Sequence, residues 1–316
     1  MNLTEADFLS IRRWMVRNAR PLDMTRWQYH FENGNKEAVL SALSAYQNED
    51  GGFGHALEAD SWNPNSSPYT THIAINIFEE IRFRDRNHEI IKKILKYLDS
   101  TPDFNGEYWP AIIASNHDYP HAPWWTDGTY DWGYTPTALL AGFILFYANK
   151  DESINRKAKN IVKTAINKYL YGTMQDGKPY HSVKREAEIH GFEKMLAFLE
   201  EMDGGQAYPI AEIKSILRQQ AAAFTEKDAS KWNQYCWKPS NFIKSPDSIF
   251  YPGNEKAIDT ELDYILNKRN AEGIWDITWS WGAYDKEFTL SQNWWKANII
   301  IENIQMLKKF GRFNQK

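Results

Sequence analysis

A short turn that follows several helical segments constrains the fold of this chain more than any other sequence feature. In each copy an acid or amide precedes a glycine, and an aromatic residue follows within a few positions. The copies begin at Asp50, Asn105, Asp176 and Glu272, at intervals of 55, 71 and 96 residues. These intervals indicate an irregular repeat of roughly fifty residues, within the range of repeat architectures. The glycine is expected to supply the left-handed residue that ends each helix, and the aromatic residue to fill the groove between neighbouring hairpins.

The segments between the turns have helical periodicity. Thr4 is expected to cap a first helix that continues to about residue 18. Residues 157–170 place their apolar side chains on one stripe, which predicts an outer amphipathic helix, whereas residues 135–148 are apolar nearly all round and predict an inner helix. A second inner helix is expected over residues 68–79. Sustained alternation of apolar and polar residues is absent from the sequence, so we expect short loop ribbons at most.

Alternating inner and outer helices predict an all-α fold, and specifically an α/α toroid, a ring of helical hairpins around a cavity. A chain of 316 residues could hold two average domains, but closed helical rings of this length form one domain. We therefore predict a single toroid domain over residues 1–316.

Composition excludes several classes of protein. Charged residues make up 25% of the chain and the formal net charge is −4, so no nucleic-acid partner is expected. Cys236 is the one cysteine, which excludes an intramolecular disulfide, and the start of the chain lacks the features of a signal peptide. We predict a cytoplasmic location. The longest apolar run, residues 138–148, is shorter than the ~20 residues of a membrane-spanning helix, so no transmembrane segment is expected.

Aromatic residues are abundant: the chain has 14 Trp, 17 Tyr and 16 Phe. Many lie outside the helical stripes, in clusters at residues 107–110, 121–134, 231–239 and 273–284. Aromatic side chains pack cores but also line clefts with their faces. Because these clusters fall in loops, they predict a lined surface.

The turns carry a resemblance to a known family. The stretch "QNEDGGFG" at residues 47–54 resembles the Gln-x-x-x-Gly-x-(Phe/Trp) repeat of the prenyltransferase and squalene-hopene cyclase superfamily. The segment "EGIWDITW", with the helix that follows it, is similar to that superfamily's last repeat, and the chain as a whole resembles a group of uncharacterised bacterial prenyltransferase-repeat-like proteins. The resemblance covers nearly the whole chain. It implies an α/α toroid and an isoprenoid substrate or ligand.

The sequence departs from the catalytic motifs of that superfamily. The Asp-x-Asp-Asp motif with which squalene-hopene-type cyclases protonate an alkene is absent, and the nearest runs, at residues 58–62 and 259–264, have the wrong spacing. Protein prenyltransferases bind zinc through Asp, Cys and His, but no Asp stands two residues before Cys236. The histidines also lack a recognised ligand spacing, so no metal and no cofactor is expected.

Candidate site residues precede the predicted inner helices, whose N-termini are expected to face the cavity and to favour anions. His55, Glu58 and Asp60 are a candidate acid/base group, in which Glu58 would raise the pKa of Asp60. The alternative is structural: Asp60 and Ser66 cap helices, and Glu58 pairs with an arginine.

Further candidates follow from the aromatic loops. A second group is centred on His121, whose alternative role is in a packed lid. The predicted catalytic residues are Asp60, Glu58, His55, Asp127 and Asp131. The predicted substrate-binding residues are Trp62, His121, Trp124, Trp125, Trp132, Tyr134, Trp279 and Trp281. We expect these residues to converge on one cavity mouth.

Three functions agree with these observations. The first is an enzyme or binding protein for an isoprenoid, whose carbocations aromatic faces would steady. The second is a carbohydrate-active toroid enzyme that uses paired carboxylates and stacked Trp, and the third is a noncatalytic toroid that binds a small molecule. A deep apolar tunnel would favour an isoprenoid, and an open groove with Trp and acids would favour a carbohydrate. The sequence leaves the oligomeric state open.

Overall fold

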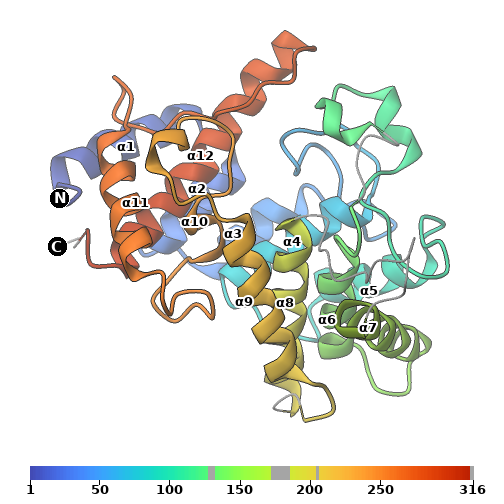
Figure 1. The fold of residues 1–316 in the computed structure, drawn as a ribbon. Helices are drawn as coiled ribbons and strands as arrows, with labels where there is room; N and C mark the ends of the chain where they lie inside the picture. Colours follow the sequence, from blue (N-terminus) through green and yellow to red (C-terminus); the bar gives the residue numbers. More distant parts are fainter. Residues whose placement is uncertain (127–131, 172–185, 204–205, 314–316) are drawn as a thin grey trace. The chain divides into compact units, whose positions relative to one another are not determined.

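The computed structural model describes residues 1–126, 132–171, 186–203 and 206–313 (Figure 1). The chain divides into two compact units, each described by itself: unit 1 comprises residues 1–43 and 223–316, and unit 2 comprises residues 44–222. This division does not by itself test the predicted single domain.

Helices form nearly all of the regular structure. Those of unit 1 are α1 (Glu5–Asn18), α2 (Pro21–Phe31), α3 (Lys36–Ser44), the 3₁₀ turn η3 (Ala229–Lys231), α10 (Pro239–Phe242), α11 (Glu255–Asn267) and α12 (Asp285–Lys309). Those of unit 2 are α4 (Pro68–Glu80), α5 (Glu89–Ser100), η1 (Ala114–Asp118), η2 (Pro123–Trp125), α6 (Thr137–Tyr147), α7 (Ser153–Tyr171), α8 (Glu186–Asp203) and α9 (Ile210–Phe224). In the described ranges, β structure is limited to isolated bridges such as Gln47 with Phe53. The all-α class is thus confirmed for these residues, and the closed ring stays a prediction.

Helix α6 forms the centre of unit 2. Every one of its side chains is buried, as expected of an inner helix, and it packs against α4, α7 and α8. A Cβ added at Gly142 would lie 2.9 Å from Met195 Cα, so the absence of a side chain at Gly142 lets α6 approach α8 closely. On α7, Ala158, Val162 and Ala165 are buried while the opposite side is exposed, which gives the predicted amphipathic helix.

Unit 1 is built around α12, which packs against α1 and α2. Thr4 caps α1 as predicted, because its hydroxyl accepts from the Asp7 amide at 3.1 Å. The ring of Phe8 stacks on Trp27 at 5.0 Å and on Phe313 at 5.1 Å, which joins both ends of the chain in one core. Aromatic burial of this kind is a large part of the hydrophobic stabilisation available to the unit.

The recurrent turns have the expected left-handed glycines at Gly51, Gly106 and Gly273, with φ of +99°, +98° and +81°. We expected these glycines to end the helices, but this was wrong, because α3, α5 and α11 end several residues earlier, at Ser44, Ser100 and Asn267. They instead reverse the loop after each helix, at a φ that side chains disfavour. The copy at Asp176 lies outside the described residues.

Two of the turns have the same hydrogen bonds. The Asn48 amide donates to Gly52 O and the Gly51 amide to Asn48 O, and the same pattern joins Asn270 to Ile274 and Gly273 to Asn270. An aromatic residue after each described turn is buried, since Phe53, Trp109 and Trp275 are 0%, 0% and 5% exposed, whereas Tyr108 of the second turn is 37% exposed. Their position between neighbouring hairpins stays a prediction.

Candidate functional site

Two loops of unit 2 bring together several residues predicted for the site. The Trp62 amide donates to Pro120 O at 2.9 Å, the Ala122 amide donates to Asp60 O at 2.9 Å, and an isolated bridge joins Ser61 to His121. The loop that carries Glu58 and Asp60 therefore lies against the loop that carries His121, although about sixty residues separate them in sequence.

The carboxylates of this loop pair are buried. Glu58 is 5% exposed and Asp60 is 3% exposed, and the Asp60 amide donates to Glu58 Oε1 at 3.2 Å. The ring of His55 is exposed, and its Nε2 bonds Asn48 Oδ1 at 2.8 Å. The cap of α4 is Ser67 and not Ser66, since Ser67 Oγ accepts from the Thr70 amide at 2.9 Å.

The aromatic residues of the second loop pack largely on one another. Trp125 is 3% exposed, stacks on Trp132 at 5.0 Å and meets Tyr69 edge-on at 4.5 Å. His121 Nδ1 donates to Tyr119 O at 2.7 Å and its Nε2 lies 3.2 Å from the Thr126 hydroxyl, so both ring nitrogens are engaged within the loop.

The other predicted site residues have different settings. Trp62 and Trp124 are half-buried, and Tyr134 is 5% exposed with its hydroxyl donating to Glu107 Oε1 at 2.9 Å. Asp127 and Asp131 lie outside the described residues.

Trp279 and Trp281 belong to unit 1, so their convergence with the unit 2 loops stays a prediction. Trp281 is 2% exposed and packs on Phe288 at 5.6 Å between ring centroids. Trp279 is half-buried and lines a pocket.

That pocket, which we call the unit 1 pocket, has a volume of about 540 Å³ and is formed by residues 232–244, α11, residues 275–279 and α12. Its aromatic lining is Trp232, Tyr235, Tyr264, Trp275, Trp279 and Trp295. Its charged lining is Lys238, Lys244, Lys268, Glu261, Asp276 and Glu302. Asn233, Asn241, Asn298 and Asn303 add amides. The volume is within the range of small-molecule sites, and the lining mixes rings with hydrogen-bonding groups.

The rings of this pocket meet edge to face. Trp279 lies 5.3 Å from Trp295 at 82°, and Tyr235 lies 6.5 Å from Trp279 at 85°. Perpendicular packing of this kind orients neighbouring ring faces in different directions. Cys236 is also part of the lining, half-buried, and burial raises the pKa of its thiol.

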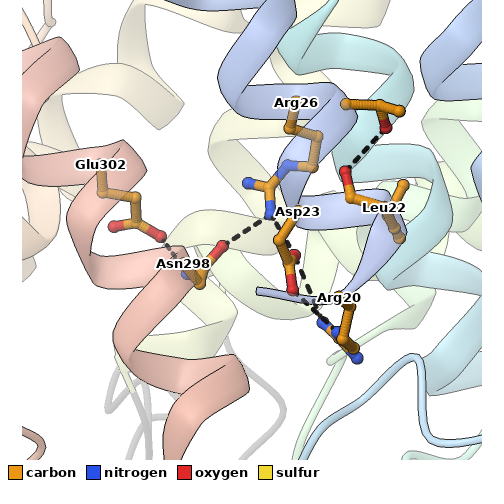
Figure 2. Close-up of polar contacts among 7 residues, drawn as sticks. Arg20, Leu22, Asp23, Arg26, Asn298 and Glu302 are labelled. Carbon is orange, nitrogen blue, oxygen red and sulfur yellow. Dashed lines mark hydrogen bonds and ion pairs between the residues drawn. The ribbon is translucent and has the colours of Figure 1, made fainter. Parts of the chain in front are cut away.

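Glu302 of α12 belongs to a chain of hydrogen bonds that runs through Asn298 to α2 (Figure 2). Its Oε2 accepts from Lys244 Nζ at 2.9 Å and its Oε1 from Asn298 Nδ2 at 2.7 Å. Asn298 Oδ1 in turn accepts from Arg26 Nη1 at 3.0 Å. Because a guanidinium can only donate, Asn298 must present its oxygen to Arg26 and its amino group to Glu302.

The direction of these hydrogen bonds determines the protonation state of Glu302, because both of its carboxylate oxygens must accept. Burial opposes its ionisation, but the charge of Lys244 and the hydrogen bonds from Lys244 and Asn298 outweigh burial and lower the pKa of Glu302. The side chain nevertheless keeps 46% of its surface accessible. Glu302 is therefore an ionised acceptor that a ligand can reach.

The network continues into α2, where it is buried. Arg26 Nη1 also binds Asp23 Oδ1 at 3.3 Å, and Arg20 Nε binds Asp23 Oδ2 at 2.8 Å (Figure 2). Asp23 is fully buried between the two arginines. It holds Arg26 in the position that orients Asn298, so α2 fixes the hydrogen-bonding pattern of the pocket.

The other two carboxylates have structural partners. Glu261 accepts from the amide and the hydroxyl of Ser240 at 2.6 and 2.5 Å, which ties the start of α10 to α11, and burial raises its pKa. Asp276 pairs with Lys296 at 2.9 Å. Glu302 differs from both in that its hydrogen bonds continue through Asn298 to Arg26.

Sequence reasoning found Trp279 but missed Glu302, Lys244 and Asn298. A signal was present: Asn298 and Glu302 are four residues apart on a helix, within the apolar run "ANIIIENI". This spacing places both on one face. Two polar residues on one face of so apolar a segment indicate a polar site.

No family model matches this chain, and neither a curated protein nor a solved structure similar to it was found. No helix in the described ranges is long and apolar enough to cross a membrane. Within the same ranges, no group of three or more His, Cys, Asp or Glu is placed to hold a metal ion.

Proposed function

We propose that the unit 1 pocket binds a carbohydrate. One observation carries the proposal: the accessible, ionised Glu302 and its partners Lys244 and Asn298 share a pocket with several Trp and Tyr side chains. A sugar ring offers apolar C–H faces to aromatic side chains and hydroxyl groups to carboxylates, amides and ammonium groups. Both kinds of group line the unit 1 pocket.

The isoprenoid that the family resemblance implies is the second candidate. The six aromatic side chains and the apolar Ile265, Ile299 and Met306 of the lining favour it. An isoprenoid tail, however, has no hydroxyl groups, so it would desolvate Glu302 and Lys244 without replacing their bonds to water. Each polar group left unsatisfied in this way costs about 1–3 kcal/mol. This cost places the carbohydrate first.

We propose binding and not hydrolysis, because the other two carboxylates of the lining already have partners. Glu261 is bound by Ser240 and Asp276 by Lys296. A paired acid and base would be needed for glycoside hydrolysis. A cytoplasmic location, which the single cysteine favours, is part of the same proposal.

The test is titration of the full chain with a panel of mono- and oligosaccharides and with farnesol, followed by calorimetry and Trp fluorescence. We expect a saccharide to bind, and Glu302→Gln and Trp279→Ala each to weaken it at least about tenfold, because a hydrogen bond to a charged group contributes about 1.5–3 kcal/mol. The matched control is Glu89→Gln, which removes an exposed carboxylate paired with Lys92 at 2.7 Å. Binding of farnesol alone, weakened by Trp279→Ala but not by Glu302→Gln, would establish the second candidate instead.

A further inference from the structure

Two lysines of the unit 1 pocket, Lys238 and Lys268, lack an acidic partner within the described part of the chain. Both line the pocket, but neither forms an ion pair with a described residue, whereas the third lysine of the lining, Lys244, pairs with Glu302 at 2.9 Å. Lys238 is half-buried and Lys268 is exposed, so a ligand can reach both side chains.

A single aromatic ring lies beside both lysines. Lys238 Nζ is 5.8 Å and Lys268 Nζ is 5.5 Å from the centroid of the Tyr264 ring, within the ~6 Å of a cation–π contact. Tyr264 comes from α11 and meets the buried Trp232 edge-on at 5.3 Å. Trp232 Nε1 in turn donates to Glu226 O at 2.8 Å. The ring that gathers the two ammonium groups is therefore itself held in place.

The remaining carboxylates of the lining do not neutralise these lysines by ion pairing. Asp276 pairs with Lys296 at 2.9 Å, and both oxygens of the buried Glu261 accept from Ser240. The charge of Lys238 lowers the pKa of Glu261, but burial has the larger effect and raises it. Two like charges near one ring repel each other, so an anion that binds both is favoured.

We infer that the ligand of the unit 1 pocket is an acidic sugar, whose carboxylate or phosphate group binds Lys238 and Lys268. The inference rests on the proposed carbohydrate function and adds the charge of the ligand to it. Oxygen atoms of carboxylates and phosphates accept strong hydrogen bonds from ammonium groups, because both partners are charged.

The other polar groups of the pocket agree with such a ligand. Glu302 is ionised, but its pairing with Lys244 offsets its charge, so it does not oppose an anion elsewhere in the pocket. Glu302 and Asn298 accept and donate hydrogen bonds, and the hydroxyl groups of a sugar can do the same. A neutral sugar has the hydroxyl groups but would leave the two lysines without a counter-ion.

The test measures binding of matched neutral and acidic sugars to the full chain by calorimetry. The pairs are glucose with glucuronate, galactose with galacturonate, and glucose with its primary phosphate ester. We expect the acidic member of at least one pair to bind about tenfold or more tightly than its neutral partner at low salt. Salt should reduce this preference, because it screens accessible charges. Acetate and inorganic phosphate are probes for an anion without a sugar.

The lysines are tested by substitution. Lys238→Gln and Lys268→Gln should each weaken the acidic sugar about fivefold or more and leave the affinity for the neutral sugar unchanged. Lys268→Arg keeps the charge and should keep the preference. The matched control is Lys256→Gln, which removes an exposed lysine of α11 that does not line the pocket. Equal melting temperatures of the variants would exclude a general loss of structure.

The possible failures are distinguishable. Equal affinities within every pair, or equal effects of Lys256→Gln and the two pocket variants, overturn the acidic-sugar inference and leave the carbohydrate proposal in place. Failure of every sugar to bind, neutral or acidic, overturns the carbohydrate proposal and the inference with it. Acetate or phosphate binding as tightly as the acidic sugars would also overturn the inference, since the site would then recognise an anion alone.

Discussion

Two glycines of unit 2 have almost the same backbone conformation but different surroundings, which makes a controlled test of the recurrent turn. Gly51 has φ +99° and Gly106 has φ +98°. A Cβ at Gly51 would lie 2.1 Å from Lys93 O and 2.6 Å from Lys93 C, whereas a Cβ at Gly106 would meet nothing within 4 Å. Replacement by alanine therefore imposes the same φ strain at both positions but a steric overlap at only one.

The magnitudes follow from this difference. Gly106→Ala is expected to reduce the free energy of unfolding by about 1–3 kcal/mol, the usual cost of a residue in a sparsely populated backbone region. Gly51→Ala adds displacement of a backbone carbonyl in α5, because contact with Lys93 is with main-chain atoms that no side-chain rotation can move. We expect its total cost to exceed about 4 kcal/mol, in the range reserved for severe backbone or core defects.

The assay is thermal unfolding of the full chain by circular dichroism, with hydrogen exchange to locate the change. At about 2–4 °C per kcal/mol for a unit of this size, Gly106→Ala should lower the melting temperature by a few degrees and Gly51→Ala by several degrees more. Exchange should increase in α5 for Gly51→Ala alone. Equal shifts for the two variants would show that φ strain accounts for both costs and that the close approach of the turn to α5 is absent.

Three further predictions concern ionisable groups. Asp23→Ala should reduce the free energy of unfolding by about 3–5 kcal/mol, since it leaves Arg20 and Arg26 without their anion, and Asp23→Ala/Arg26→Met should recover part of the loss in urea titrations. Burial, with the charges of His190 and Lys194, lowers the pKa of His72 from 6.5 to about 3, so between these values the unfolded state binds a proton that the folded state does not. Stability should then fall by up to about 1.4 kcal/mol per pH unit on acidification from pH 6.5, and the His72→Gln variant should show a shallower slope. The pKa of Glu302 is lowered in the folded state. Its carboxylate therefore stabilises the fold above the unfolded pKa of 4.5, and this stabilisation is lost as pH falls through the folded pKa. Glu302→Gln should remove that loss of stability in acid, and an unchanged dependence of stability on pH would contradict the prediction.

The sequence predicted several helices, among them α1, α4, α6 and α7, because each carries a local signal. The all-apolar character of residues 138–148 identified α6 as buried, and the one-sided stripe of α7 identified a surface helix. The position of the turn glycines relative to the helix ends was wrong, because a left-handed glycine is equally compatible with a helix terminus and with a loop reversal. Only the hydrogen bonds of Asn48 and Asn270 distinguish the two.

The candidate sites were less predictable, since their residues meet through tertiary packing. Glu302, Lys244 and Arg26 come from α12, the segment after α10 and α2, and no short motif joins them. Asp50 had been assigned to the turn alone, and its position at a pocket depends on where α5 lies.

The recurrent turn lies beside a pocket in each of the two units. In unit 2 the turn at Asn48–Gly52 contributes Asn48 and Asp50 to a pocket, and in unit 1 the turn at Asn270–Ile274 leads directly into Trp275 and Asp276 of the other pocket. In both, the aromatic residue five positions after the asparagine is buried and so anchors the loop against its unit. An anchored loop holds its neighbouring polar groups without further packing, which is the requirement for a preorganised binding site. The same turn geometry therefore lies beside an anionic pocket in one unit and an aromatic pocket in the other. The residues beside the buried aromatic side chain differ in type between the two turns, whereas the backbone hydrogen bonds are the same.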